Sequence, residues 1–102
     1  MAMLIALYGT PDDPVAFDQY YFQTHVPIAK RVPGLRGYQV TRGPVMSPGG
    51  ASAWYLVAML TFDSMQAVQA ALASPEGQAT AADLANFATG GVELLFGDTA
   101  TI

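Results

Sequence analysis

The chain has 102 residues, which suits a single domain, and it contains no cysteine, so disulfides and thiolate metal sites are excluded. Hydrophobic residues make up 52% of the chain and charged residues only 12%, about half of the roughly 25% found in ordinary soluble domains. The formal net charge is -4, which argues against nucleic acid and anionic membrane surfaces as partners, because both require a dominant basic field.

The N-terminal segment MAMLIALYGTPDD lacks the basic region of a secretory signal, and its apolar run is short. No stretch reaches the roughly 18 to 20 consecutive apolar residues that a membrane-spanning helix needs. The sequence therefore predicts one soluble domain over residues 1–102, with no membrane partner. We also expect a cytoplasmic location; the absence of cysteine is compatible with that reducing compartment.

The first half of the chain predicts a strand, a helix and a second strand. Residues Met3–Gly9 form a short apolar run closed by the turn-rich segment GTPDDP, which is typical of a buried strand. Asp13 followed by Pro14 predicts a helix start, with a side-chain cap and a proline at the first helical position. Leu35–Gly43 alternates and carries Tyr, Val and Thr, which favours a strand. Residues 44–52 are then expected to form a connecting loop.

The first predicted helix has an apolar stripe and an interruption. Its residues Phe17, Tyr21 and Ile28 recur at spacings of four and seven, which places them on one stripe at about 100° per residue. Pro27 removes a backbone donor inside this pattern, so a kink or break is expected near His25.

The second half predicts a central strand, two short helices and a last strand. Ala53–Phe62 is too rich in aromatic and branched residues for a surface strand and belongs near the centre of a sheet. Asp63, with a glutamine three residues later, resembles a capping box, and Ser74-Pro75 predicts a second helix start. Gly90-Gly91 ends the helical stretch before the strand VELLF.

The predicted order of elements is β, α, β, β, α, β, without internal repeats. This is the split βαβ pattern, in which two right-handed crossovers place both helical segments on one face of a four-stranded antiparallel sheet. The sequence therefore predicts an α+β protein with a ferredoxin-like βαββαβ fold, in which one face of the sheet stays uncovered.

The predicted central strand is apolar on both faces. Helices can bury only one face, and a naked face on the order of 400 Å² is about the largest apolar patch that monomers show. We therefore expect a homodimer that pairs the open sheet faces isologously, with the helices outside. Alternation places Trp54, Leu56, Ala58, Leu60 and Phe62 on one face and Tyr55, Val57 and Met59 on the other.

The segment Tyr20–Val40, YYFQTHVPIAKRVPGLRGYQV, resembles the signature of the EthD family within the dimeric α+β barrel superfamily. The similar features are the tyrosine pair, the histidine, a proline two residues later, then Pro-Gly-Leu and a strand. The resemblance implies the fold predicted above along nearly the whole chain. The family is named after a bacterial gene cluster for degrading ethyl tert-butyl ether. Similar folds serve haem-degrading monooxygenases, muconolactone isomerase and polyketide cyclases, which use a pocket between helices and sheet and often no metal.

His25 is the only histidine and therefore the only side chain whose unperturbed pKa, about 6.5, lies close to neutral pH. One interpretation is that it only satisfies backbone groups freed by Pro27, whereas the match to the family's histidine favours proton transfer. Tyr21 lies one turn before His25, so its hydroxyl can hydrogen-bond the substrate or the imidazole, with core packing as the alternative. We predict His25 and Tyr21 as the catalytic residues.

Substrate binding is predicted for Phe17, Tyr38, Arg42 and Trp54. Ordinary core packing is the alternative for Tyr38 and Trp54, because aromatic residues dominate cores. Arg42 belongs to a cluster that could guide an anionic substrate or could simply complement a helix C-terminus and lie in solvent. This cluster contains all four cationic residues of the chain, which fall within the thirteen residues 30–42: Lys30, Arg31, Arg36 and Arg42.

Neither a nucleotide site nor a metal site is predicted. The segment MSPGGAS lacks the lysine of a phosphate-binding loop. A single histidine without cysteine or a spaced carboxylate cannot furnish three protein ligands locally, although an axial haem ligand would need only one. We therefore expect no metal and no cofactor.

Three functions are compatible with these residues. The first is a cofactor-free cyclase, isomerase or decarboxylase, in which His25 moves a proton on a small hydrophobic carbonyl compound of a catabolic or secondary-metabolic pathway. The second is a monooxygenase, or an oxidoreductase accessory protein of ether degradation, as the family's name suggests. The third is a non-catalytic binder of an apolar metabolite, which needs the pocket but not His25. We favour the first, because a kinked helix presents the one near-neutral titrating group beside a tyrosine.

Overall fold

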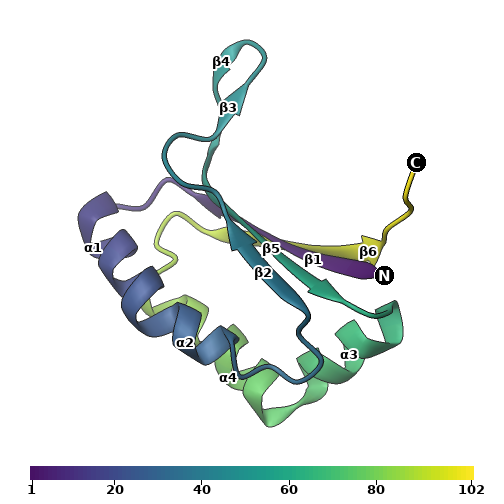
Figure 1. The fold of residues 1–102 in the computed structure, drawn as a ribbon. Helices are drawn as coiled ribbons and strands as arrows, with labels where there is room; N and C mark the ends of the chain where they lie inside the picture. Colours follow the sequence, from purple (N-terminus) through teal and green to yellow (C-terminus); the bar gives the residue numbers. More distant parts are fainter.

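A computed structural model describes all of residues 1–102 (Figure 1). Its elements are β1 (Ala2–Gly9), α1 (Pro14–Tyr20), the π-helix η1 (Tyr21–His25), α2 (Val26–Ala29), β2 (Gly37–Val40), β3 (Met46–Ser47), β4 (Gly50–Ala51), β5 (Trp54–Phe62), α3 (Met65–Ala73), α4 (Pro75–Asp83), the short 3-10 helix η2 (Leu84–Asn86) and β6 (Val92–Asp98). None of the helices is long and apolar enough to cross a membrane.

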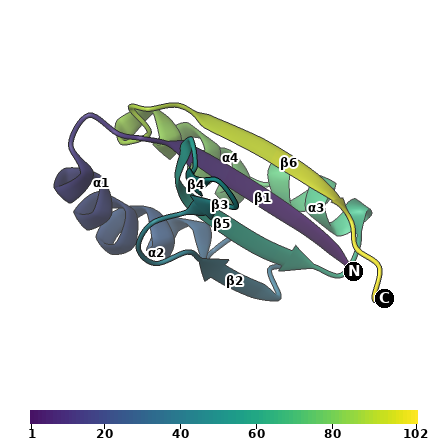
Figure 2. The same ribbon diagram turned by 90° about the horizontal axis from the view of Figure 1, so that it is seen from above.

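Four strands form one antiparallel sheet in the order β2-β5-β1-β6. The first and last strands in the chain therefore lie side by side, with Ala2 opposite Asp98. The helices lie together on one face of this sheet, as Figure 1 and Figure 2 show from two directions, and the molecule measures 34 × 34 × 17 Å. The predicted βαββαβ sheet with its helices on one face is confirmed.

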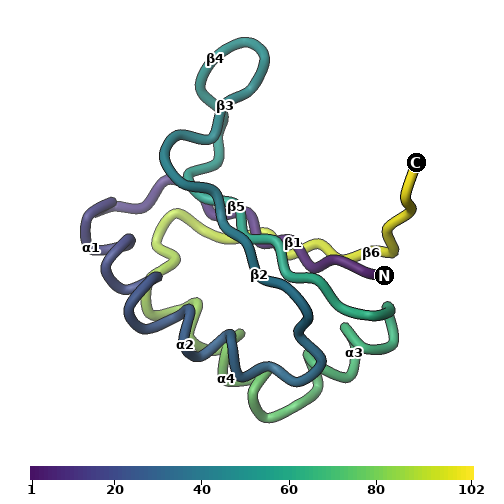
Figure 3. The backbone as a smooth tube through the Cα atoms, in the orientation of Figure 1, coloured from purple at the N-terminus to yellow at the C-terminus, as the bar shows by residue number.

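The connection between β2 and β5 contains a short hairpin, where the sequence predicted only a loop over residues 44–52. β3 pairs with β4, and this hairpin projects away from the sheet and the helices (Figure 3). β2 is also shorter than the predicted strand over residues 35–43, because Gly43, with a φ of 78°, turns the chain toward the hairpin.

The helix starts follow the predicted caps at two of three places. Asp13 and Ser74 each accept a hydrogen bond from the backbone N–H three residues on, as predicted. Ahead of α3 the cap is Ser64 and not Asp63, so that prediction was wrong by one residue. Asp63 instead pairs with Arg36 through two hydrogen bonds of 3.1 and 2.9 Å, which leaves the neighbouring serine to cap the helix.

Alternation along β5 holds from Leu56 to Phe62 but fails at Tyr55, which the sequence placed beside Val57 on the open face. Pairing with β1 slips by one residue at this end of the strand, so Tyr55 is the extra residue of a β-bulge. Its ring packs edge-on against Phe17 of α1, with ring centroids 5.2 Å apart. The bulge has therefore turned Tyr55 toward the helices.

The two faces of the sheet differ in cover. Along β1 and the regular part of β5, every second side chain is buried against the helices. The alternate side chains lie on the open face and are only half-buried, and all of them except Thr61 are apolar. On the open face lie Met3, Ile5 and Leu7 of β1, Val57 and Met59 of β5 and Leu95 of β6.

Candidate active site between helices and sheet

The predicted interruption of the first helix is present as a π-helical segment. Residues Tyr21–His25 form η1, which lies between α1 and α2 and directly before Val26 and Pro27. Pro27 has no N–H and its ring crowds the carbonyl one turn earlier, so the backbone there cannot keep regular α-helical bonding. Single π-helical turns of this kind occur frequently at functional sites.

The wider turn of η1 places four buried residues on one line. Phe17, Tyr21, His25 and Ala29 are spaced by four, and in a regular α-helix such a series would rotate by about 40° at each step. A π-helical turn takes up this rotation, so all four face the core. The predicted stripe was therefore wrong at Ile28, which is only half-buried, and Ala29 takes its place.

His25 is bound to an aspartate that the sequence analysis did not select. His25 Nδ1 lies 2.9 Å from Asp83 Oδ2, and the two residues are only 3% and 7% exposed. The other carboxylate oxygen of Asp83 accepts hydrogen bonds from the Tyr20 hydroxyl at 2.6 Å and from Asn86 Nδ2 at 2.9 Å. The side chains of α1, η1, the end of α4 and η2 thus form one polar network, which is buried at the His25–Asp83 contact and partly buried at the other two hydrogen bonds.

The protonation states follow from these contacts. Burial lowers the pKa of His25 below its ordinary value, and this effect outweighs the opposing influence of Asp83. Burial works to raise the pKa of Asp83, but hydrogen bonds from Tyr20, Asn86 and His25 together lower it. At neutral pH the pair is therefore a neutral imidazole that donates its Nδ1 proton to an ionised carboxylate.

The second ring nitrogen, His25 Nε2, makes no hydrogen bond in the structure. No fully buried side-chain nitrogen or oxygen lacks a partner, so Nε2 must keep some contact with open space. Its ring also lies against Phe87, with centroids 4.7 Å apart. Nε2 is therefore an unprotonated nitrogen in a mostly apolar environment, which is the state that a general base requires.

A small cavity lies between the helices and the sheet, and its connection to His25 is Tyr21, which lines the cavity and has its ring 5.4 Å from the imidazole. Its volume is about 70 Å³, and 14 of its 16 lining residues are hydrophobic. Tyr8 of β1, Tyr21 of η1 and Tyr38 of β2 all line it, and the hydroxyls of Tyr21 and Tyr38 are hydrogen-bonded at 2.7 Å. Burial is the main cause that raises the pKa of each of these three phenols, so all stay protonated near neutral pH.

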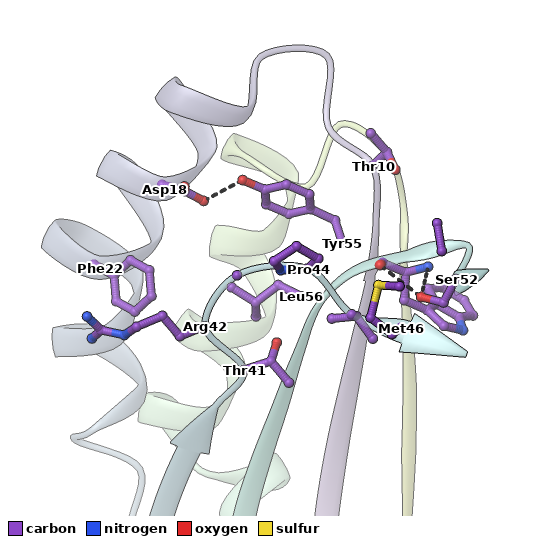
Figure 4. Close-up of a pocket in the computed structure, with 14 residues that line it drawn as sticks. Thr10, Asp18, Phe22, Thr41, Arg42, Pro44, Met46, Ser52, Tyr55 and Leu56 are labelled. Carbon is purple, nitrogen blue, oxygen red and sulfur yellow. Dashed lines mark hydrogen bonds between the residues drawn. The ribbon is translucent and has the colours of Figure 1, made fainter. Parts of the chain in front are cut away.

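A larger groove of about 890 Å³ opens outside the core (Figure 4). Asp18 and Phe22 line it from the helices, and Arg42 lines it from the segment that leads to the hairpin. Tyr55 donates a hydrogen bond to Asp18 at 2.8 Å across this groove. Trp54 is a further lining residue, and Arg42 forms no ion pair or side-chain hydrogen bond.

The predicted site residues therefore fall into two groups. His25, Tyr21 and Phe17 are brought together in the core, with the Tyr21 ring 5.4 Å from His25 and 5.8 Å from Phe17. Tyr38 joins them through its hydroxyl, whereas Arg42 and Trp54 lie apart in the outer groove. Of the other cations, Lys30 and Arg31 are exposed just after α2, and Arg36 is bound to Asp63.

Asp83, Asn86, Tyr20 and Tyr8 are the polar residues of the site that sequence reasoning did not select. Asp83 stands in an alanine-rich helix, where a lone aspartate has the same local pattern whether it faces solvent or the core. Only the packing of that helix beside η1 gives it a role. Tyr8 was counted as part of a buried strand, and nothing local distinguishes its hydroxyl.

The protein is a small ferredoxin-like α+β protein. Its helices cover one face of a four-stranded sheet, and a histidine–aspartate pair and a tyrosine-lined cavity lie on that side. The EthD domain matches residues 11–91, and the chain belongs to the EthD family. It is 40% identical over 102 residues, 100% of this chain and 98% of the relative, to an uncharacterized 11.0 kDa protein in the thcB-thcC intergenic region of Rhodococcus erythropolis.

Solved structures agree with this assignment. An EthD family protein from Bacillus halodurans is 40% identical, with a TM-score of 0.89 over 98% of this chain and 99% of that one. SnoaB, a cofactor-independent oxygenase from Streptomyces nogalater, is 17% identical with a TM-score of 0.67 over 99% and 94%. A dimeric ferredoxin-like protein from Bacteroides fragilis is 19% identical with a TM-score of 0.64 over 96% and 95%. The last two likenesses show the fold alone.

Proposed function

We propose that this EthD protein acts on a small hydrophobic carbonyl compound by cofactor-free acid–base chemistry, with His25 as the base. The observation that carries the proposal is the buried His25–Asp83 pair, which holds the proton on Nδ1 and leaves Nε2 free to accept another. The rings of Tyr21 and Phe87 lie beside the imidazole, with centroids 5.4 and 4.7 Å from it, and Tyr21 also lines the cavity together with Tyr38.

Asp83 is a positioning residue in this mechanism. When Nε2 takes a proton from the substrate, the imidazole becomes a cation in a buried place, which is unfavourable without a counter-charge. The ionised carboxylate 2.9 Å from Nδ1 supplies that charge. Tyr20 and Asn86 hold the carboxylate in place through its other oxygen, so it does not reorient during proton transfer.

The apolar walls favour a hydrophobic substrate. A cavity of about 70 Å³ is smaller than the roughly 150 Å³ that holds a benzene molecule, so it admits the reacting end of a substrate and not a large ring system. The outer groove, with Arg42 and Trp54, is proposed to hold the remainder of a longer substrate. The cytoplasmic location stays a prediction.

The test is proton exchange on simple ketones. Wild-type protein in D₂O with 2-butanone should speed the loss of α-proton signals in NMR spectra. His25→Gln should reduce this acceleration about 10²-fold or more, the usual contribution of a general base. Lys30→Gln, which alters an exposed cation after α2, is the control and should exchange like wild type.

Each alternative function gives a different result in the same samples. Exchange that is unchanged in His25→Gln contradicts the proposed role of the histidine. Ketone binding without exchange, equal in wild type and His25→Gln, favours a non-catalytic carrier. Consumption of dissolved oxygen together with substrate favours a monooxygenase or an oxidoreductase accessory protein of ether degradation, for which the fold of SnoaB, a cofactor-independent oxygenase, is a precedent.

We further propose that the protein works as a homodimer joined through the open sheet face. That face carries half-buried apolar residues on β1 and β5 and the exposed Leu95 on β6, and the thin molecule has no second layer of helices to cover them. Structural neighbours of this fold include dimeric ferredoxin-like proteins. Two copies related by a two-fold axis would bury both faces.

Sedimentation at micromolar concentration tests the dimer. Wild type should sediment as a dimer, and Met59→Glu, which puts a charge in the centre of the open face, should sediment as a monomer. Gln69→Glu on the exposed side of α3 adds the same charge elsewhere and should leave the dimer intact. A strictly monomeric wild type would contradict this interface.

A further inference from the structure

Tyr8 is the one tyrosine whose hydroxyl has no hydrogen-bond partner in the structure. The residue is only 2% exposed, and its ring is held edge-on by Phe17 and Tyr21 at centroid distances of 5.5 and 5.6 Å. No fully buried polar side-chain atom lacks a partner, so this hydroxyl must border open space. Tyr8 lines the 70 Å³ cavity.

The cavity contains more hydroxyl hydrogens than it uses. Tyr8, Tyr21 and Tyr38 bring three, and the single bond between Tyr21 and Tyr38 uses one of them. Thr80 also lines the cavity, but its hydroxyl donates to the carbonyl oxygen of Glu76 at 2.8 Å. Two O–H donors therefore remain free among walls that are otherwise apolar.

We infer that Tyr8, together with the Tyr21–Tyr38 pair, forms a two-donor subsite for the carbonyl oxygen of a ketone or aldehyde. A carbonyl oxygen has two lone pairs and no hydrogen, so it satisfies both free donors. An alcohol would bring one more O–H hydrogen into apolar surroundings, and a hydrocarbon would leave both donors without a partner. A sphere of the cavity's volume is only about 5 Å across, so one oxygen atom can lie within reach of both donors.

This inference deepens the proposed function and rests on it for its chemical meaning. If Nε2 of His25 removes a proton from the carbon next to the carbonyl, the C–H electron pair forms a C=C bond, the π pair of the carbonyl moves to its oxygen, and an enolate results. Two tyrosine O–H groups already aimed at that oxygen stabilise the negative charge without rearrangement. Because their pKa values are raised by burial, Tyr8 and Tyr21 stay as neutral donors and keep their protons.

The test compares a ketone with its hydrocarbon isostere. 2-Butanone and 2-methyl-1-butene have the same shape, and only the first carries an acceptor oxygen. Titrations followed by NMR should show that wild type binds 2-butanone more tightly than 2-methyl-1-butene. Tyr8→Phe keeps the ring and its edge-on contacts, and should weaken 2-butanone about fivefold to tenfold while binding the alkene at least as well as wild type does.

The matched control is Thr99→Val, which removes an exposed hydroxyl bonded to the Met1 carbonyl away from both the cavity and the groove, and which should bind 2-butanone like wild type. His25→Gln should also bind it normally, because the subsite does not include the imidazole. If wild type binds 2-butanone more tightly than Tyr8→Phe does but catalyses no proton exchange, the proposed function is contradicted and the subsite is still supported. Equal binding of 2-butanone by wild type and Tyr8→Phe overturns the subsite, as does a wild type that binds the alkene as tightly as the ketone. The second comparison needs no variant and holds even if Tyr8→Phe fails to fold.

Discussion

Replacing Asp83 with asparagine keeps the size of the side chain and removes its charge. In the structure, Oδ1 accepts from Tyr20 and Asn86, whereas Oδ2 accepts only from His25. An asparagine has one oxygen, and two donors hold that oxygen at the Oδ1 position. Its NH₂ group then faces the Nδ1–H of His25, and two donors oppose each other.

The loss can be estimated from that single contact. A hydrogen bond to a charged group contributes about 1.5–3 kcal/mol, and the opposed donors forfeit it. For a domain of about 100 residues, the melting temperature falls by roughly 4–8 °C per kcal/mol, so Asp83→Asn should melt roughly 6–24 °C below wild type. His25 can recover part of this loss only by moving its proton to Nε2. The nitrogen proposed as the base would then no longer be free.

Two measurements check this argument together. Thermal melts report the stability, and ¹⁵N NMR of the imidazole reports which nitrogen carries the proton. Asp18→Asn is the control, since Asp18 also accepts a tyrosine hydroxyl, at 2.8 Å, but on the exposed surface, and its effect should stay within about 0.5 kcal/mol. An Asp83→Asn protein that melts like wild type and keeps the proton on Nδ1 would refute the reasoning.

Three further outcomes are expected. Burial lowers the pKa of His25 in the folded protein, so on acidification the unfolded chain takes up a proton first. The free energy of unfolding should therefore fall as the pH drops below about 6.5. In denaturant melts above pH 5, His25→Gln should not show this fall. Gly77→Ala should lower the free energy of unfolding by about 1–3 kcal/mol, because a new Cβ would overlap the carbonyl oxygen of Ala71. Gly49→Ala places its Cβ in open space and is the control; thermal melts of the two variants should show a loss for Gly77→Ala alone. Ser74→Ala should lose about 1–2 kcal/mol in the same assay, since its hydroxyl both caps α4 and donates to Ala71; an unchanged melting temperature would refute the cap.

The sequence predicted those features that depend on residues near one another in the chain. Asp13 and Ser74 were identified as caps because a side chain reaches only a few residues along the backbone. Pro27 predicted the irregular helix at His25 because its missing donor is a local defect. The four-stranded antiparallel sheet with its helices on one face followed because the split βαβ pattern has few compact solutions.

The errors and omissions depend on partners that lie far away in the chain. Tyr55 was placed on the wrong face because its bulge exists only in register with β1, which periodicity within β5 cannot report. Asp83 is 58 residues from His25, and the polar contact appears only when two helices pack on the same sheet face. The free hydroxyl of Tyr8 is likewise a property of the assembled cavity.

The neighbouring positions of β1 and β6 have a consequence for how the fold is encoded. The backbone N–H of Thr99 donates to the carbonyl of Met1 at 3.0 Å, while the β3–β4 hairpin stands apart from the sheet (Figure 1). A circularly permuted chain, joined between residues 99 and 1 and opened at the tip of the hairpin, would keep all pairings of the main sheet and all contacts of His25. The architecture is specified by which segments lie next to each other, and the order in which they are synthesised is dispensable.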